Sequence, residues 1–425
     1  DVSEQAGIYG SNVGFGLGVS VGDLNLDGAP DLFVSNDFFE RDYLYLNRGD
    51  GSGFTEVLEQ SIRETSMGSM GADIADVNND GLPDIFVTEM LPQSDARMKT
   101  KTKFENWELY QREIENGYYH QFTRNTLQLN LGKLGDNFKL PPNLKPPHFT
   151  EISRLAGVHA TDWSWGALIL DMDNDGWKDI FVANGIGKDL TDQDYVNFYS
   201  DPKAVQAIIQ KEKNAITKLV DAMPSEKIPN YAFQNQLADA SRQSPITNPQ
   251  SPIPTFKDQA AAWGLSEPSF SNGSAYGDLD NDGDLDLVVN NLDMPSFLYR
   301  NNADTLSKDQ HFLNIRLVGE GMNTHAIGAK VTLRSGGKLL FQEVSPMRGF
   351  ESTCDSRLHF GLGELEKVDT LLAEFPGGAQ LLLTNVSADQ FLTLHQKDAK
   401  PHTPPTPKGE QTQPLFKNVT ARFSL

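Results

Sequence analysis

An acidic loop of nine residues occurs four times in this chain, and each copy runs directly into an apolar stretch. Loops one to four span residues 23–31, 76–84, 171–179 and 278–286. All four have Asp at positions 1, 5 and 9, Asp or Asn at position 3, and Gly at position 6. The stretches that follow are Leu-Phe-Val, Ile-Phe-Val, Ile-Phe-Val and Leu-Val-Val, which are typical of buried strands. A loop that repeats together with its strand constrains the chain to a repetitive β-fold.

Side-chain oxygens at alternate positions of a tight turn are the ligands that Ca²⁺ prefers. We expect about four Ca²⁺ sites, one in each loop, bound by side chains at positions 1, 3, 5 and 9 and by the backbone carbonyl at position 7. The expected ligands are Asp23, Asn25, Asp27, Ala29 and Asp31; Asp76, Asn78, Asp80, Leu82 and Asp84; Asp171, Asp173, Asp175, Trp177 and Asp179; and Asp278, Asp280, Asp282, Asp284 and Asp286. Loops three and four have Asp at position 3, so they should bind the ion most tightly.

The loops differ from EF-hands in the residue at position 12. An EF-hand requires a bidentate Glu there and a helix on each side. Position 12 is Val34, Val87, Val182 or Val289, and valine cannot bind a metal ion. The flanking residues are strand-like on both sides, so each loop is expected to connect the two strands of a hairpin.

Two further strand-like stretches follow each of the first three loops, which gives units of four strands, A to D. Successive loops begin 53, 95 and 107 residues apart, whereas one blade of a β-propeller takes about 40–50 residues. We therefore predict an all-β fold, with propeller blades over residues 1–302 and helical insertions at about 91–123 and 186–229. Both insertions separate strand B from strand C. Because the connections between successive antiparallel strands alternate between the two faces of the propeller disc, the insertions should lie on the face opposite the acidic loops.

The blades resemble FG-GAP (VCBS-type) repeats over about residues 1–302. Residues 310–396 read as a small all-β module of short alternating strands, and they resemble the ASPIC/UnbV domain. The matching stretches are Asn323-Thr-His-Ala-Ile-Gly328-Ala-Lys330-Val, Arg348-Gly-Phe-Glu-Ser, His359-Phe-Gly361-Leu-Gly363 and Val368-Asp-Thr-Leu with Phe375-Pro-Gly-Gly378. Phe375 stands where that family more often has Trp. The combination resembles the cartilage acidic protein-like family and its bacterial members, and it implies calcium loops like those of the integrin α-subunit propeller.

The two ends of the chain resemble parts of further repeats. Asp1-Val-Ser-Glu-Gln-Ala-Gly-Ile aligns with residues 151–158, which begin inside a D strand. Residues 397–413 read as a Pro-rich linker, and residues 414–425 as the start of a further propeller strand. We therefore expect this chain to be a piece of a longer protein. The sequence shows no transmembrane segment.

Charge and cysteine usage indicate where such a chain would work. The net charge is −22, and no basic stripe is present to neutralise phosphates, so nucleic acid is not an expected partner. Calcium loops suit the calcium-rich space outside cells, and the single Cys354 provides no disulfide framework. We expect an extracytoplasmic location: secreted, periplasmic or on the outer-membrane surface.

These features favour a calcium-stabilised binding or adhesion module whose partner is a protein or a glycan. The partner is expected on the face opposite the calcium loops, where the insertions carry a surplus of aromatic residues. These are Trp107, Tyr110, Tyr118, Tyr119, Phe122, Tyr195, Phe198 and Tyr199. Two alternatives remain open: a carbohydrate-active or other hydrolytic enzyme with its site in the propeller channel, and a scaffolding subunit of an outer-membrane complex. No catalytic residue can be named.

Overall fold

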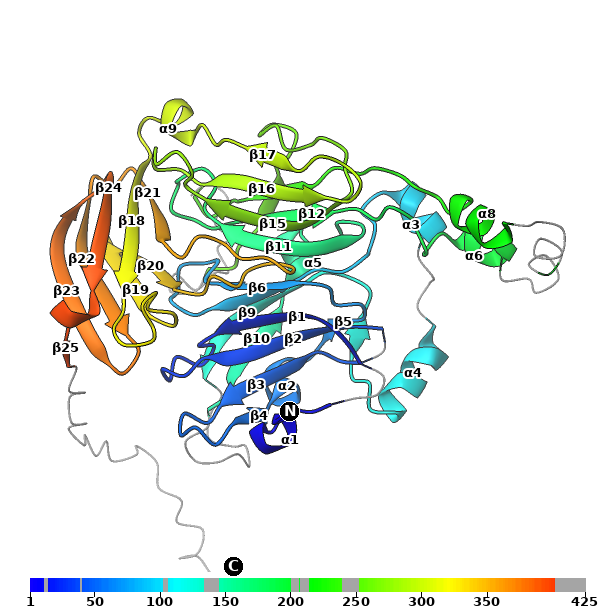
Figure 1. Ribbon diagram of the computed structural model, residues 1–425, viewed down its shortest axis with the longest axis horizontal. Coiled ribbons are helices and arrows are strands. Elements are labelled where there is room, and N and C mark those ends of the chain that lie inside the picture. The colour runs from blue at the N-terminus through cyan, green and yellow to red at the C-terminus, as the bar shows by residue number, and fades with distance from the viewer. Residues whose placement is uncertain are drawn as a thin grey trace, which may run out of the picture.

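A computed structural model describes residues 1–10, 14–38, 40–101, 106–133, 145–199, 206, 214–238 and 252–401 of the chain. Figure 1 shows a stack of β-sheets, with a separate pair of sheets on one side and the helices α3, α6 and α8 on the other. The expected start of a further strand at 414–425, and the proposed linker from residue 402 onward, lie outside the described residues. The prediction of a mostly β fold built from four-stranded sheets, with few helices, is confirmed.

Four antiparallel sheets form the repetitive part of the chain, and each contains one acidic loop between its first two strands. Sheet one is β1 (Phe15–Gly22), β2 (Asp31–Asp37), β3 (Tyr43–Asn47) and β4 (Phe54–Glu56); sheet two is β6 (Ala72–Ala75), β7 (Asp84–Val87), β9 (Thr126–Lys133) and β10 (Pro147–Glu151). Sheet three is β11 (Ser164–Leu170), β12 (Asp179–Asn184), β13 (Tyr231–Asn235) and β14 (Phe256–Asp258); sheet four is β15 (Ser271–Gly277), β16 (Asp286–Asn291) and β17 (Phe297–Tyr299). Sheet four has three strands within the described residues.

The first strands of the four sheets lie next to one another, β1 beside β6, β6 beside β11 and β11 beside β15. We call them the inner strands. Apolar side chains fill the spaces between adjacent sheets, with one core between sheets one and two, one between two and three, and one between three and four. Short helices follow the last strands of sheets one and two, α2 (Leu58–Ser61) after β4 and α5 (Ser153–Ala156) after β10, and α1 (Ser3–Ala6) precedes β1. This radial stacking of four-stranded sheets is the arrangement of propeller blades.

The two insertions contain helices and contact each other. The first holds α3 (Asp95–Lys101), α4 (Trp107–Glu115) and β8 (Gln121–Phe122), which pairs with β5 (Thr65–Ser66); the second holds α6 (Gln193–Tyr199) and α8 (Ala215–Asp221). Lys101 of α3 lies 3.2 Å from Asp189 and 2.6 Å from Asp192 of the second insertion. Arg97 pairs with Asp162 and Glu226 and lies 3.6 Å from Asp189. These ion pairs hold the insertions together.

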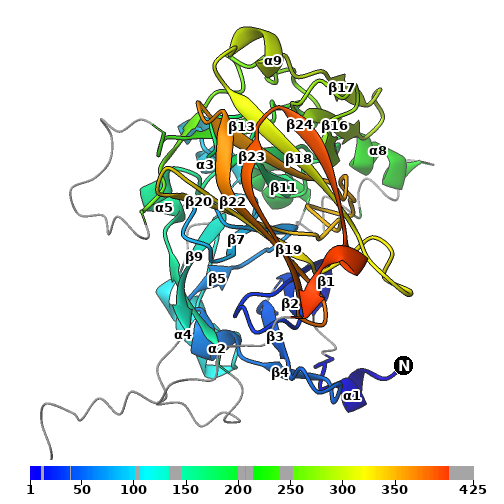
Figure 2. The same cartoon turned by 90° about the vertical axis from the view of Figure 1, so that its left-hand side faces the viewer.

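The C-terminal domain, residues 311–401, has its own apolar core between two sheets. One sheet contains β18 (His311–Val318), β21 (Leu358–Gly363) and β24 (Gln390–His395); the other contains β19 (Lys330–Ser335), β20 (Lys338–Glu343), β22 (Lys367–Phe375), β23 (Ala379–Ser387) and β25 (Lys400–Pro401). The helix α9 (Ala303–Leu306) precedes this domain, and the 3₁₀ turn η2 (Gln396–Asp398) follows β24. Figure 2 shows the two sheets lying across the ends of the blades.

One segment of the C-terminal domain enters the space between the inner strands. We call residues 344–357, which connect β20 to β21, the axial segment. Phe350 packs so closely on Gly166 of β11 that a Cβ at that position would lie 2.6 Å from the Phe350 Cβ, so only glycine fits there. The Ser345 hydroxyl donates to the Val21 carbonyl at 3.1 Å, and the Asp355 amide donates to the Tyr276 carbonyl at 3.2 Å. The axial segment therefore fills the centre of the blade array.

Candidate metal centres

The four acidic loops share one backbone conformation. The residue at position 4 has a positive φ in every loop: Leu26 (53°), Asn79 (56°), Asn174 (61°) and Asn281 (60°). The glycine at position 6 has a φ between 87° and 98° in every loop. Left-handed backbone is easy for Gly and tolerable for Asn, whereas it costs about 1–2 kcal/mol for a residue such as Leu. The repeated Gly at position 6 therefore has a conformational cause.

The aspartates at positions 1 and 9 organise each loop through backbone hydrogen bonds. In loop one, Asp23 accepts from the amides of Asp27 and Gly28 at 3.0 and 2.7 Å. Both oxygens of the position 9 carboxylate accept hydrogen bonds. One accepts from the backbone amide of position 2, and the other accepts from the backbone amide of an asparagine in or just after the third strand. These bonds recur in all four loops at 2.8–3.0 Å. Position 9 thus ties the loop to strand C.

Those asparagines also connect neighbouring blades. The side-chain amides of Asn130, Asn235 and Asn301 donate to the position 2 carbonyl of the preceding loop, at 3.0, 2.9 and 2.8 Å. Each also donates to the position 8 carbonyl of its own loop, at 3.0–3.1 Å. We did not assign these residues from the sequence, although an Asn at the same place in each unit is a readable signal.

Loop three has the most buried group of carboxylates. Oxygens of Asp171, Asp173 and Asp179 lie within 4.8 Å of one another. Burial raises the pKa of Asp171 and Asp179 well above the ordinary value, and neighbouring carboxylates raise it further. Asp171 Oδ1 is buried and has no hydrogen-bond partner among the described residues. Clustered carboxylates without a counter-ion are unstable when ionised, and a divalent cation would remove that instability.

Loop four is more exposed and offers two overlapping groups of carboxylates. One contains Asp278, Asp280 and Asp282, and the other Asp282, Asp284 and Asp304. Arg300 lies 2.8 Å from Asp280 and 2.9 Å from Asp282, and its side chain is 59% exposed. Because so exposed an arginine can turn into solvent, it need not exclude a metal ion from this loop.

Loops one and two do not form such a group within the described part of the chain. Each has Asn at position 3, and each has a lysine beside its first aspartate. Lys330 of the C-terminal domain forms an ion pair with Asp23. Lys178 of loop three donates instead to the Asp76 backbone carbonyl at 3.0 Å. Burial raises the pKa of Asp31 to about 8 and that of Asp76 to about 6.

The structure therefore brings together only part of each expected ligand set. In loop three the grouped positions are 1, 3 and 9, and in loop four they are 1, 3 and 5. The position 7 residues, whose carbonyls were the expected ligands, bond the loop through their amides: those of Ala29, Leu82, Trp177 and Asp284 donate to the position 5 carboxylate at 3.0, 2.9, 2.7 and 3.4 Å. Asp175, which stays outside the group, has its pKa raised to about 7 by burial.

The C-terminal domain covers all four loops, which the sequence did not reveal. Besides Lys330 at loop one, Leu339 approaches Gly81 of loop two. His359 Nε2 lies 2.7 Å from Asn174 Oδ1 of loop three. The Arg357 guanidinium donates to the Asp278 carbonyl of loop four at 2.7 Å. Three of these contact residues, at positions 330, 357 and 359, lie in or beside the stretches that resemble the ASPIC/UnbV domain.

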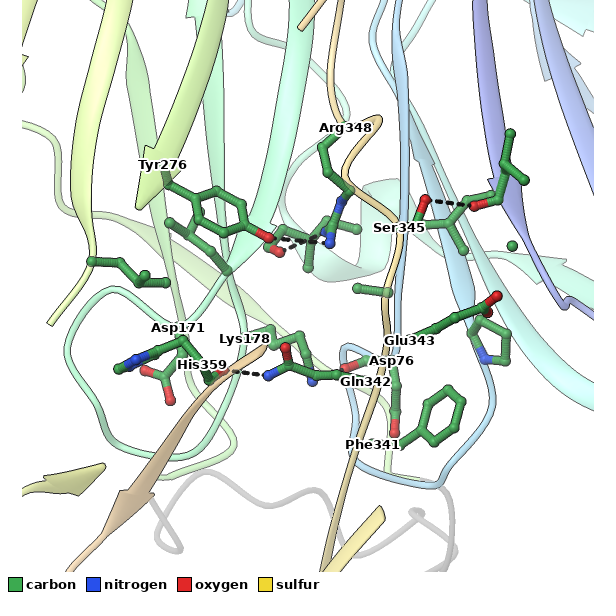
Figure 3. Close-up of a pocket in the computed structure, with 18 residues that line it drawn as sticks. Asp76, Asp171, Lys178, Tyr276, Phe341, Gln342, Glu343, Ser345, Arg348 and His359 are labelled. Carbon is green, nitrogen blue, oxygen red and sulfur yellow. Dashed lines mark hydrogen bonds between the residues drawn. The ribbon is translucent and has the colours of Figure 1, made fainter. Parts of the chain in front are cut away.

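The cavity enclosed between the blades and the C-terminal domain is small and polar (Figure 3). Its volume is about 40 Å³, and its wall includes Asp76, Asp171, Lys178, Glu343 and Arg348. Burial raises the pKa of Glu343 to about 7. A space of this size has room for a few water molecules but not for a sugar ring.

A larger cavity lies on the insertion side of the molecule, between α4 and β8. Its volume is about 380 Å³, and Trp107, Tyr110 and Phe122 line it. The ring centroids of Trp107 and Tyr110 are 5.5 Å apart, and those of Tyr110 and Phe122 are 5.8 Å apart. Trp107 is 72% exposed. Tyr119, by contrast, packs against the core of sheets one and two, and the side chains of Phe198 and Tyr199 lie outside the described residues.

Comparison with known proteins identifies both parts of the chain. Residues 12–87 match the FG-GAP-like repeat family, and residues 319–401 match the ASPIC and UnbV family. The chain is 40% identical over 83 residues to integrin alpha-7 of Homo sapiens, an alignment that covers 17% of this chain and 7% of that protein. Among the helices that the structure describes, none is long and apolar enough to cross a membrane. The chain contains an FG-GAP-like repeat region followed by an ASPIC/UnbV domain.

Proposed function

We propose that this chain is a calcium-binding module in which the loops of the FG-GAP-like repeats hold the ions. The observation that carries the proposal is loop three, where three carboxylates lie together and a buried Asp171 oxygen lacks a partner among the described residues. Hard divalent cations bind such oxygen-only sites, and Ca²⁺ tolerates their irregular geometry better than Mg²⁺ does.

Calorimetric titration of the calcium-depleted chain tests this proposal. Ca²⁺ should bind with measurable heat, and a large excess of Mg²⁺ should compete poorly. Asp173→Asn removes one grouped carboxylate of loop three and should weaken or abolish one site. Asp369→Asn, at an exposed carboxylate of strand β22 that belongs to none of the acidic groups, is the matched control and should change nothing. An absence of calcium binding by the wild-type chain would exclude the proposal.

We further propose that the calcium-loaded blades present the insertion face to a protein or glycan partner outside the cytoplasm. The cavity beside α4, with the exposed Trp107 next to Tyr110, supports this location. Aromatic faces stack on sugar rings and anchor protein interfaces. Binding of the wild-type chain to glycan and peptide arrays, compared with Trp107→Ala, tests the site. Arg112→Ala, at an exposed residue of the same helix that does not line the cavity, is the control for helix stability.

The competing enzyme hypothesis placed a site in the propeller channel. The axial segment occupies that space and leaves a cavity of about 40 Å³, which disfavours a hydrolytic site there.

Deleting the whole second insertion would be a poor test of partner binding, because Asp189 and Asp192 neutralise Arg97 and Lys101 of the first insertion. Point variants such as Trp107→Ala separate binding from folding more cleanly.

A further inference from the structure

Loops one and two have the same complement of side-chain ligands. Both have three aspartates, at positions 1, 5 and 9, and asparagine at position 3. Their first aspartates accept the same two backbone hydrogen bonds, Asp23 from the amides at positions 5 and 6 of loop one and Asp76 from those of loop two. Any difference in metal binding between these loops must therefore come from their surroundings.

Each loop has a lysine beside its first aspartate, but the two lysines are placed differently. Lys330 of strand β19 extends from the C-terminal domain, and its ammonium group pairs with Asp23 Oδ2. The Lys330 side chain is 13% exposed and that of Asp23 is 2% exposed, so water screens this pair poorly. Glu343, which lies opposite Lys330 in the β19–β20 ladder, accepts from the Asp23 amide at 3.0 Å. The hairpin therefore holds the lysine in place over loop one.

Loop two has no equivalent pair within the described residues. Lys178 lies beside Asp76, but it donates to the backbone carbonyl of that residue, and the structure shows no lysine within ion-pair distance of the Asp76 carboxylate among the residues it describes. In loop one the first expected ligand, Asp23, already binds an ammonium group, whereas no lysine among the described residues pairs with the Asp76 carboxylate of loop two.

We propose that Lys330 supplies the cation of loop one, so that this loop takes no Ca²⁺ while the C-terminal domain is docked. The inference rests on the calcium binding proposed above and assigns the ions to particular loops. A calcium ion bound through Asp23 would have to lie about 2.3–2.6 Å from its oxygen, where the ammonium group already sits, and two cations cannot share that position. Loop one is thus neutralised from within the protein, and it joins the two domains electrostatically instead of binding metal.

The number of calcium ions bound per chain tests the assignment. Equilibrium dialysis of the full chain against buffered Ca²⁺, followed by elemental analysis, measures that number directly. Lys330→Met should bind one ion more than the wild type. In the Lys330→Met background, Asp23→Asn should remove the additional ion. Lys367→Met, an exposed lysine of the same domain, is the matched control and should leave the number unchanged.

The wild-type background gives an independent readout that does not depend on how well Lys330→Met folds. There, Asp23→Asn should leave the number of bound ions unchanged, whereas Asp76→Asn should lower it by one. An unchanged number in Lys330→Met, or the loss of one ion in the wild-type Asp23→Asn variant, would overturn the assignment while calcium binding itself stands. If no form of the chain binds Ca²⁺, the proposed function fails first, and that outcome is distinct from either of these.

Discussion

Replacing Arg348 with Met should destabilise the docked protein by about 3–4 kcal/mol at pH 7. The guanidinium of Arg348 makes two bonds to the Asp73 carboxylate, at 2.5 and 2.7 Å, and it also donates to the Tyr276 hydroxyl at 3.1 Å and the Ile169 carbonyl at 3.0 Å. Asp73 is buried. Breaking a buried ion pair by removing one partner typically costs about 3–5 kcal/mol, because the other charge is left without compensation.

Protonation of the stranded Asp73 carboxylate sets an upper limit to this loss of stability and makes the loss depend on pH. A carboxylate that has lost its partner can bind a proton, and protonating an ordinary aspartate costs about 4 kcal/mol at pH 7 but about 1.5 kcal/mol at pH 5. The part of the Arg348→Met penalty that comes from the unpaired charge therefore cannot exceed these values. The loss of stability should therefore become smaller as the pH falls, since the stranded carboxyl then accepts its proton more easily.

Urea unfolding followed by circular dichroism at pH 7 and pH 5 measures the loss of stability and its pH dependence. Because the two domains need not unfold together, the first unfolding transition is the one to compare. The double variant Arg348→Met with Asp73→Asn removes the stranded charge and keeps an oxygen to accept the Ile169 amide bond, which is 2.7 Å long in the wild type. It should regain more than half of the lost stability at pH 7. Equal losses at the two pH values, or a double variant no more stable than the single one, would refute the reasoning.

Three further predictions concern the metal loops and the insertions. Asp171→Asn should lower the melting temperature in calcium and change it little in chelator, as differential scanning calorimetry would show. An ion that binds only the folded form stabilises it by RT ln(1+[L]/Kd), which is about 2.7 kcal/mol per site at a hundredfold excess over Kd. The calcium-free protein should lose stability as the pH rises from about 4 to 7. Burial raises the pKa of Asp76 to about 6 and that of Asp175 to about 7, so the folded form keeps protons that the unfolded form releases. Saturating calcium should remove this trend in calorimetry. Arg97→Ala should leave calcium binding unchanged but speed limited proteolysis within the second insertion, because Asp162 and Glu226 lose their partner.

The repeated fold could be predicted because its signals are local. Each acidic loop runs directly into its strand, and the Gly at position 6 is needed by the turn itself, as its positive φ shows in every copy. The order of strands within a blade follows from the same sequence unit, so it also places the two insertions on one face. The packing of Lys101 against Asp189 and Asp192 could not be predicted, because charged residues at those positions have many available partners on a surface.

The candidate site could be predicted less completely, for a different reason. The sequence assigned the position 9 aspartates to the metal, whereas the structure shows that both of their oxygens accept backbone amides in every loop. Only in loop three does the position 9 aspartate, Asp179, both accept these amides and lie in a group of carboxylates among the described residues. Lys330 was not identified at all, because it lies 307 residues from Asp23 in the sequence. A contact between domains leaves no periodic pattern that a reading of the chain could detect.

The arrangement of charge bears on the partner site proposed above. The four loops carry 15 aspartates, yet this acidic face is covered by the C-terminal domain, which brings Lys330 and Arg357 to it. Much of the net charge of −22 is therefore directed at an internal boundary, where lysine, arginine and the proposed calcium ions neutralise it, and not at an external ligand. On the opposite face, none of the described residues covers the cavity beside α4 in this way, and Trp107 is exposed there. A partner that depends on calcium would thus sense the ions indirectly, through the rigidity that they give to the blades beneath the insertions.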